Sequence, residues 1–109
     1  QAARDLIVTS RVISRQSMLG YDLAANYPNP FNPETTIVFR IPQPEYIRLE
    51  IFDVSGKKVR TLADRHFAAG QHAFHWDGAA QNGLVASGVY FYRLQAGSFV
   101  QTKSMLLLR

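Results

Sequence analysis

The side chains that could do chemistry on their own are three histidines and a serine that precedes a glycine. His72 and His75 lie three residues apart in a predicted strand, so their side chains point to opposite faces and cannot share a metal ion. His66 stands apart from both. Ser87 precedes Gly88 without the Gly-x-Ser-x-Gly spacing and the following helix that a serine nucleophile requires. We therefore expect surface histidines and a turn serine, with no catalytic residue.

Acidic side chains give no clearer sign of a site. The chain has no cysteine, which excludes disulfides, iron–sulfur ligation and cysteine-bound zinc. Residues 77–83 form an acidic, glycine-containing loop, but Ala79 stands where a calcium loop needs an oxygen ligand. We expect no metal and no cofactor, and no two carboxylates are spaced like a glycosidase pair. The carboxylates are Asp5, Asp22, Glu34, Glu45, Glu50, Asp53, Asp64 and Asp77.

The charge pattern argues against nucleic acid as a partner, and the hydropathy pattern argues against a membrane-spanning segment. The net charge is +4, with the densest basic run at residues 57–60. Beside the turn at residues 55–56, this run predicts a solvated edge strand rather than an anion site. Charges alternate in sign along the strands, so no basic stripe for nucleic acid forms. No apolar stretch is long enough to span a membrane, and the missing signal peptide together with the start at Gln1 suggests a fragment of a longer chain.

Aromatic side chains leave one binding function open. A flat row of exposed rings on a β-sandwich could stack on sugars, whereas rings that cover the ends of the core would only stabilise it. The sequence favours the second interpretation without excluding the first. The rings in question are Tyr21, Tyr27, Phe31, Tyr46, Phe52 and Phe67.

The element that precedes the predicted strands is a proline-rich lead-in strip, residues 26–33. Its three prolines remove backbone donors and fix φ, so it cannot be a helix or a central strand. The residues before the prolines are pushed toward extended conformations. The strip consists of Asn26, Tyr27, Pro28, Asn29, Pro30, Phe31, Asn32 and Pro33.

After the lead-in strip the hydrophobic pattern repeats every second residue, as in strands. Strands are expected at 35–41, 47–51, 57–62, 72–76, 89–94 and 99–108, with a loop at 82–83. Short strands are also possible at 6–9 and 11–13. Tyr90 can turn its hydroxyl back to form a tyrosine corner, with Tyr92 pointing inward two residues later. The sequence therefore predicts an all-β fold, an immunoglobulin-like antiparallel β-sandwich of about seven strands. Residues 1–25 would be a linker or N-terminal edge segment and residues 26–109 the domain.

The lead-in strip resembles the opening of type A C-terminal sorting domains of the type IX secretion system. It is also similar to related immunoglobulin-like domains, including that of the flagellar hook-cap protein. The resemblance covers about residues 26–109 and continues through residues 51–59, 69–72, 76–78, 85–94 and 103–109. One departure is the pair Ala79–Ala80, where relatives often carry an acidic residue after Trp-Asp-Gly.

The resemblance implies a non-catalytic domain that directs export of a larger secreted protein across the outer membrane and its attachment to the cell surface. The implied partners are the secretion machinery, an upstream cargo domain in the same chain, and surface lipopolysaccharide. The implied route runs through the periplasm to the cell surface or beyond. The terminal strand would form an edge that a partner could extend by strand pairing. The expected recognition residues are Gly88, Tyr90, Lys103, Met105, Leu106, Leu107, Leu108 and Arg109.

Two other functions remain open at this point. The domain could be a carbohydrate-binding module of a multidomain secreted enzyme, or a structural spacer similar to a hook-cap domain. The first would depend on exposed rings, and the second would not require a free terminal strand.

Overall fold

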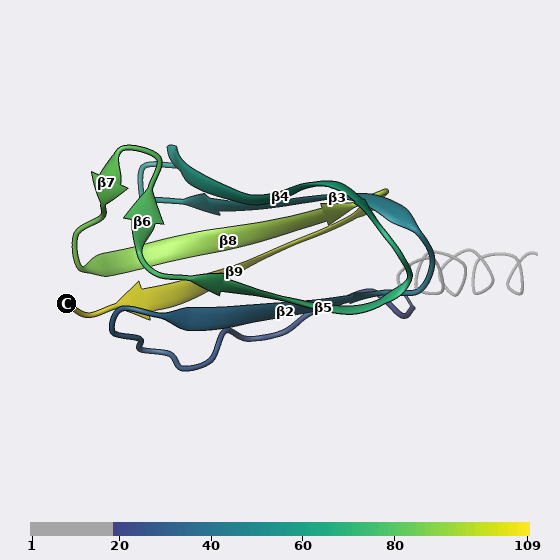
Figure 1. Cartoon of the computed structure of the whole chain (residues 1–109), viewed down its shortest axis with the longest axis horizontal. Helices are drawn as coiled ribbons and strands as arrows, with labels where there is room; N and C mark the ends of the chain where they lie inside the picture. Colours follow the sequence, from purple (N-terminus) through teal and green to yellow (C-terminus); the bar gives the residue numbers. More distant parts are fainter. Residues whose placement is uncertain (1–18) are drawn as a thin grey trace, which may run out of the picture.

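The computed structural model describes residues 19–109 and contains strands, turns and loops (Figure 1). The two short strands expected at residues 6–9 and 11–13 lie outside the described residues. Within residues 19–109, no helix has the length and apolar character that a membrane crossing requires. The strands are β1 (Asp22–Leu23), β2 (Thr35–Ile41), β3 (Glu45–Phe52), β4 (Lys58–Phe67), β5 (Gly70–Trp76), β6 (Ala79–Ala80), β7 (Gly83–Leu84), β8 (Gly88–Ala96) and β9 (Phe99–Leu107).

Seven of these strands form two antiparallel sheets that pack face to face (Figure 1). One sheet has the order β1-β2-β5 and the other the order β4-β3-β8-β9, and β6 and β7 form a separate ribbon at one end. The predicted fold, an all-β immunoglobulin-like sandwich of about seven strands, is confirmed.

Alternating side chains build the core between the sheets. Residues 35–41 of β2 alternate between buried and exposed or half-buried positions, and β8 does the same. The largest fully buried side chains come from both sheets and from the lead-in strip, and include Trp76, Tyr92, Phe31 and Phe39. Phe39 stacks on Phe74, with ring centroids 6.0 Å apart. Because β2 and β8 each show one apolar face to the same interior, their period-two pattern predicts two packed sheets.

Two details differ from the expectation. Residues 79–84 fold into the β6–β7 ribbon rather than a plain loop. Strand β4 continues to Phe67, five residues beyond Leu62, with register shifts in its pairing to β3. Ahead of residue 26, β1 pairs with β2 as an edge strand and Leu23 is buried in the core. The ribbon was not predicted because its small and polar residues form no apolar face.

Candidate functional site

The lead-in strip crosses from one sheet to the other. At its start Tyr27 pairs antiparallel with Thr36 of β2, and farther along Phe31 pairs parallel with Leu107 of β9. The amide of Phe31 donates to the Leu106 carbonyl at 3.0 Å, and its ring is buried against Trp76, with centroids 5.8 Å apart. The strip therefore closes one flank of the sandwich.

A buried polar network fixes the start of the strip. The hydroxyl of Tyr92 donates to the Ala24 carbonyl at 2.8 Å and accepts from the Asn26 amide at 2.9 Å. The Asn26 side chain donates to Thr35 Oγ1 at 3.0 Å, while Asn26 Oδ1 has no hydrogen-bond partner among the residues described. Burial raises the pKa of Tyr92. The network was not predicted; the one available signal was Thr35, a polar residue on the inward face of its strand.

The tyrosine corner is confirmed. The hydroxyl of Tyr90 donates to the Ala86 carbonyl at 2.6 Å, and the ring packs edge-on against Trp76, with centroids 5.5 Å apart. Burial raises the pKa of Tyr90. Gly88, two residues earlier, pairs with Leu107 at the end of β9. Gly88 and Tyr90 thus hold the terminal hairpin at one end of the sandwich.

The other expected recognition residues lie on β9 and just after it. Strand β9 is an edge of the four-stranded sheet. Met105 and Leu107 point inward and are buried, while Leu108 is exposed. Lys103 also lies on the inward-facing side, half-buried and opposite Tyr92. The structure places these residues on one hairpin, and their role in sorting stays a prediction.

The end of this edge, which we expected to be open to a partner strand, is paired within the chain. The Leu106 amide donates to Asn29 Oδ1 at 3.0 Å, its carbonyl accepts from Phe31, and the Leu108 amide donates to the Phe31 carbonyl at 2.9 Å. The lead-in strip already occupies the position of a neighbouring strand at residues 106–108. The free part of the edge lies earlier in β9.

Arg109 ties the end of β9 to the loops around the β6–β7 ribbon. Its guanidinium donates to the Val85 carbonyl at 2.6 Å and to the Gly78 carbonyl at 2.8 Å. Its backbone amide donates to Ser87 Oγ at 2.8 Å. Gly78 has φ +76° and is buried, and a Cβ there would collide with the Arg109 guanidinium. The last side chain of the sequence thus makes a structural contact.

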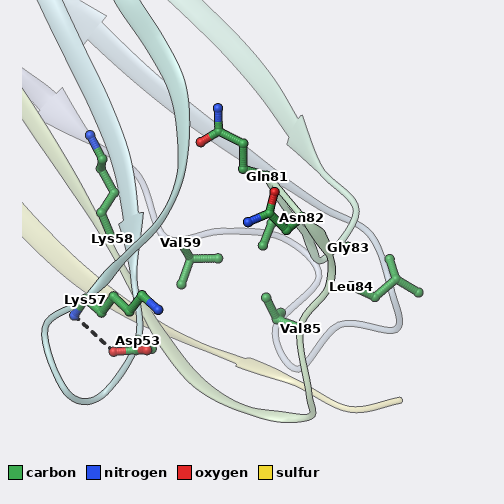
Figure 2. A pocket seen from close by; sticks show the side chains of 10 residues that line it. Asp53, Lys57, Lys58, Val59, Gln81, Asn82, Gly83, Leu84 and Val85 are labelled. Atoms are coloured by element: carbon green, nitrogen blue, oxygen red, sulfur yellow. Dashed lines mark hydrogen bonds between the residues drawn. The ribbon is translucent and has the colours of Figure 1, made fainter.

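A hollow of about 370 Å³ lies between the ribbon and the β3–β4 turn (Figure 2). The basic run contributes Lys57 and Lys58 to its rim, and Lys58 also bonds Glu50 at 3.4 Å. Asp53 Oδ1 accepts from the Ser55 hydroxyl at 2.6 Å and from the Lys57 amide at 3.0 Å. The Ser55 hydroxyl, followed by the backbone amides of Lys57 and Ser55, lowers the pKa of Asp53. The run lies at the start of an edge strand, as predicted.

The remaining candidate side chains, the histidines and potential metal ligands, do not come together in one site. His72 lies among aromatic rings and bonds the Ala68 carbonyl at 2.8 Å, whereas His75 is exposed and bonds Thr36. The prediction that the two histidines point to opposite faces is confirmed. Across residues 19–109, no group of three or more potential metal ligands comes together.

The aromatic residues do not form the exposed row that sugar stacking would need. Phe31 and Phe67 are buried, which corrects the suggestion that they could be exposed. Tyr27 is 80% exposed beside β2, and Tyr46 is 46% exposed on β3 of the other sheet. Since these two rings lie on different sheets, they cannot contribute to one flat platform.

Comparison with solved structures identifies the same fold in longer proteins. Dimeric latent PorU from Porphyromonas gingivalis aligns with a TM-score of 0.64 and 20% identity, over 81% of this chain and 9% of PorU. PorZ from the same organism, a surface component of its type-IX secretion system, aligns with a TM-score of 0.56 and 19% identity, over 83% of this chain and 12% of PorZ. The chain therefore spans about a tenth of each of these proteins.

A hook-capping protein shares the fold as well. FlgD from Xanthomonas campestris aligns with a TM-score of 0.54 and 23% identity, over 88% of this chain and 73% of FlgD. No curated protein sequence matches the chain. The family model of the FlgD Ig-like domain matches residues 31–99, which is more than half of the sequence. The chain belongs to the FlgD Ig-like domain family.

Proposed function

We propose that this domain is a non-catalytic module that directs export of a larger protein across the outer membrane and attaches it to the cell surface. The observation that carries the proposal is the shared sandwich of PorU and PorZ. The alignments cover more than 80% of this chain but at most 12% of those proteins, one of which is a surface component of the type-IX secretion system. The proposed partners are that machinery, a cargo domain in the same chain and surface lipopolysaccharide.

The arrangement of side chains supports a recognition role over a chemical one. The groups that could act as acids, bases or nucleophiles are dispersed over both sheets, and the polar networks mainly satisfy backbone groups. These networks hold the lead-in strip, the ribbon and the terminal hairpin in one arrangement. A preformed surface of this kind suits recognition by another protein, since little ordering entropy is lost on binding.

The test is delivery of a reporter. Residues 19–109 are fused behind a periplasmic reporter in a bacterium with a type IX system, and surface exposure is measured by protease accessibility in intact cells. We expect the reporter to reach the surface with the domain and to stay in the periplasm without it. Retention of the fused reporter in the periplasm, with the domain folded, would overturn the proposal.

The matched control separates folding from recognition. Truncation after Thr102 would remove the buried side chains of Met105 and Leu107 and so would unfold the sandwich. A better control is Leu49→Asp, which buries an unpaired charge at a fully buried position and leaves the terminal hairpin unchanged in sequence. If this unfolded variant is exported as well as the wild type, a linear signal and not the folded surface is read.

A second candidate is a structural role similar to hook capping, which the likeness to FlgD favours. Such a module would act through its assembly with other subunits and would not carry a cargo to the surface. In the reporter experiment it would leave the reporter in the periplasm. A bulky tag appended after Arg109 should be tolerated in that case, whereas a surface-sorting module should lose delivery.

A further inference from the structure

One stretch of the β9 edge is open and is bracketed at both ends. At the start of the strand the ring of Tyr21 stacks on Phe99, with centroids 5.2 Å apart. At its end the lead-in strip bonds residues 106–108. Between these two contacts lie residues 100–104, which we call the β9 window. Five residues of strand span roughly 17 Å, which is room for a short extended segment.

The backbone groups of alternate residues in the β9 window point away from β8, toward the open side of the edge. Leu106 directs both its amide and its carbonyl outward, to Asn29 and Phe31. The register between β8 and β9 is continuous from Gly88↔Leu107 to Ala96↔Phe99. Because backbone groups alternate along an antiparallel strand, the amides and carbonyls of Val100, Thr102 and Ser104 share the outward direction of Leu106. None of them bonds another residue in the described part of the chain.

The other edge of the same sheet is protected in a way that β9 is not. Strand β4 carries Lys58, Arg60 and Arg65, and its pairing with β3 contains two register shifts. Charges and irregular pairing discourage the addition of a further strand. The side chains of the β9 window on the solvent-exposed face of the sheet are uncharged, and they include the strand-favouring Val100 and Thr102.

Lys103 determines which strand the window can accept. Its side chain lies on the inward-facing side of the edge, beside buried Met105 and opposite Tyr92. It makes no ion pair with any residue from 19 to 109. A strand added next to β9 would enclose this ammonium group, which is unfavourable unless the new strand brings a carboxylate opposite it. An inward lysine therefore disfavours neutral strands and excludes basic ones.

We infer that the β9 window binds an extended acidic segment of a partner protein by strand addition, with a carboxylate side chain opposite Lys103. The net charge of +4 favours an acidic partner during the encounter as well. The inference rests on the proposed function only for the assumption that the terminal hairpin meets a partner. The binding chemistry follows from the edge itself.

The experiment is an NMR titration of the ¹⁵N-labelled chain with the capped peptide Thr-Val-Thr-Glu-Thr-Val-Thr. Two matched peptides carry Gln or Lys in place of Glu. We expect saturable shifts of the Val100, Thr102 and Ser104 amides at millimolar peptide. The Glu peptide should bind about tenfold more tightly than the Gln peptide, and the Lys peptide should not bind. Equal affinity for all three peptides, or no shift in the window, would overturn the inference.

Three variants test the geometry. Thr102→Pro removes one outward amide and should abolish binding, whereas Thr102→Val keeps the amide and should bind normally. Lys103→Met should retain binding but lose the preference for Glu over Gln. If Thr102→Pro does not fold, slowed hydrogen exchange of the Thr102 amide on addition of the Glu peptide tests the same contact in the wild type.

The edge of β5 serves as the internal control, since Gly70–Trp76 also contains no Lys, Arg, Asp or Glu. Shifts that occur on β5 and not on β9 would overturn the assignment. Failure here is distinguishable from failure of the proposed function. A reporter that still reaches the surface with Thr102→Pro, together with no peptide binding, removes the window and leaves the export role intact.

Discussion

Tyr92 joins β8 to the segment between β1 and β2 through a single hydroxyl group. The hydroxyl donates to the Ala24 carbonyl and accepts from the buried Asn26 amide. Removing it by Tyr92→Phe leaves that amide without a partner, so we expect the free energy of unfolding to fall by about 2 kcal/mol. Tyr46→Phe is the matched control, because its hydroxyl bonds the Asp64 carbonyl at the exposed surface. Urea unfolding should show a clear loss for the first variant and little change for the second.

Asp53 should make stability depend on pH in the acid range. The Ser55 hydroxyl and nearby backbone amides lower the pKa of Asp53 below its ordinary value of 3.8. The carboxylate therefore stabilises the fold above that value, and this contribution is lost as the pH falls through the lower, folded-state pKa. Asp53→Asn should remove this part of the acid dependence. The measurement is urea unfolding at a series of pH values below 5, and parallel curves for the two proteins would contradict the assignment.

Among the elements, the lead-in strip offers a comparison within eight residues. Phe31 is buried and Tyr27 is 80% exposed. Phe31→Ala should lower the free energy of unfolding by about 3–5 kcal/mol through the cavity that it leaves. Tyr27→Ala should change it by less than about 0.5 kcal/mol. If both substitutions change the free energy of unfolding equally little, the strip stabilises the domain through its backbone alone.

The β6–β7 ribbon depends on the contact between Gly78 and Arg109. Gly78→Ala forces a non-glycine residue into φ +76° and displaces the guanidinium, so it should destabilise the domain by about 1–2 kcal/mol. Arg109→Ala alone removes the two carbonyl contacts and should speed hydrogen exchange at the Val85 amide, which bonds the Gly78 carbonyl. In the double variant the loss in the free energy of unfolding should be smaller than the sum of the two single losses, because both substitutions remove the same contact.

The strands could be predicted from the sequence, but the segments that close the sandwich around them could not. Alternating apolar residues mark β2, β3 and β8 because each shows one face to a common core. The lead-in strip was correctly excluded from central strands by its prolines, but its pairing with β9 joins residues far apart in sequence, which a local pattern cannot reveal. Arg109 was predicted to be a recognition residue because of its place in a motif. Its contacts with Gly78 and Val85 depend on where two loops meet in space.

At the level of the whole molecule, the β9 flank of the sandwich is closed in part by the segment ahead of β2. On the β9 side, residues 21–31 run along one sheet and then cross to the other. This segment leaves the β9 window as an interruption in an otherwise closed flank. The position of this window follows from the path of residues 21–31, so this segment and the terminal hairpin together determine which part of the β9 edge stays open.

The path of residues 21–31 predicts how much of the chain the domain needs. A fragment that begins at residue 26 lacks the buried Leu23 and the contacts of Tyr21 with Phe99 and Glu45. Compared with residues 19–109, it should lose about 4 kcal/mol in the free energy of unfolding. Urea unfolding of the two fragments measures the difference directly. Equal stability would show that the sandwich folds without residues 19–25.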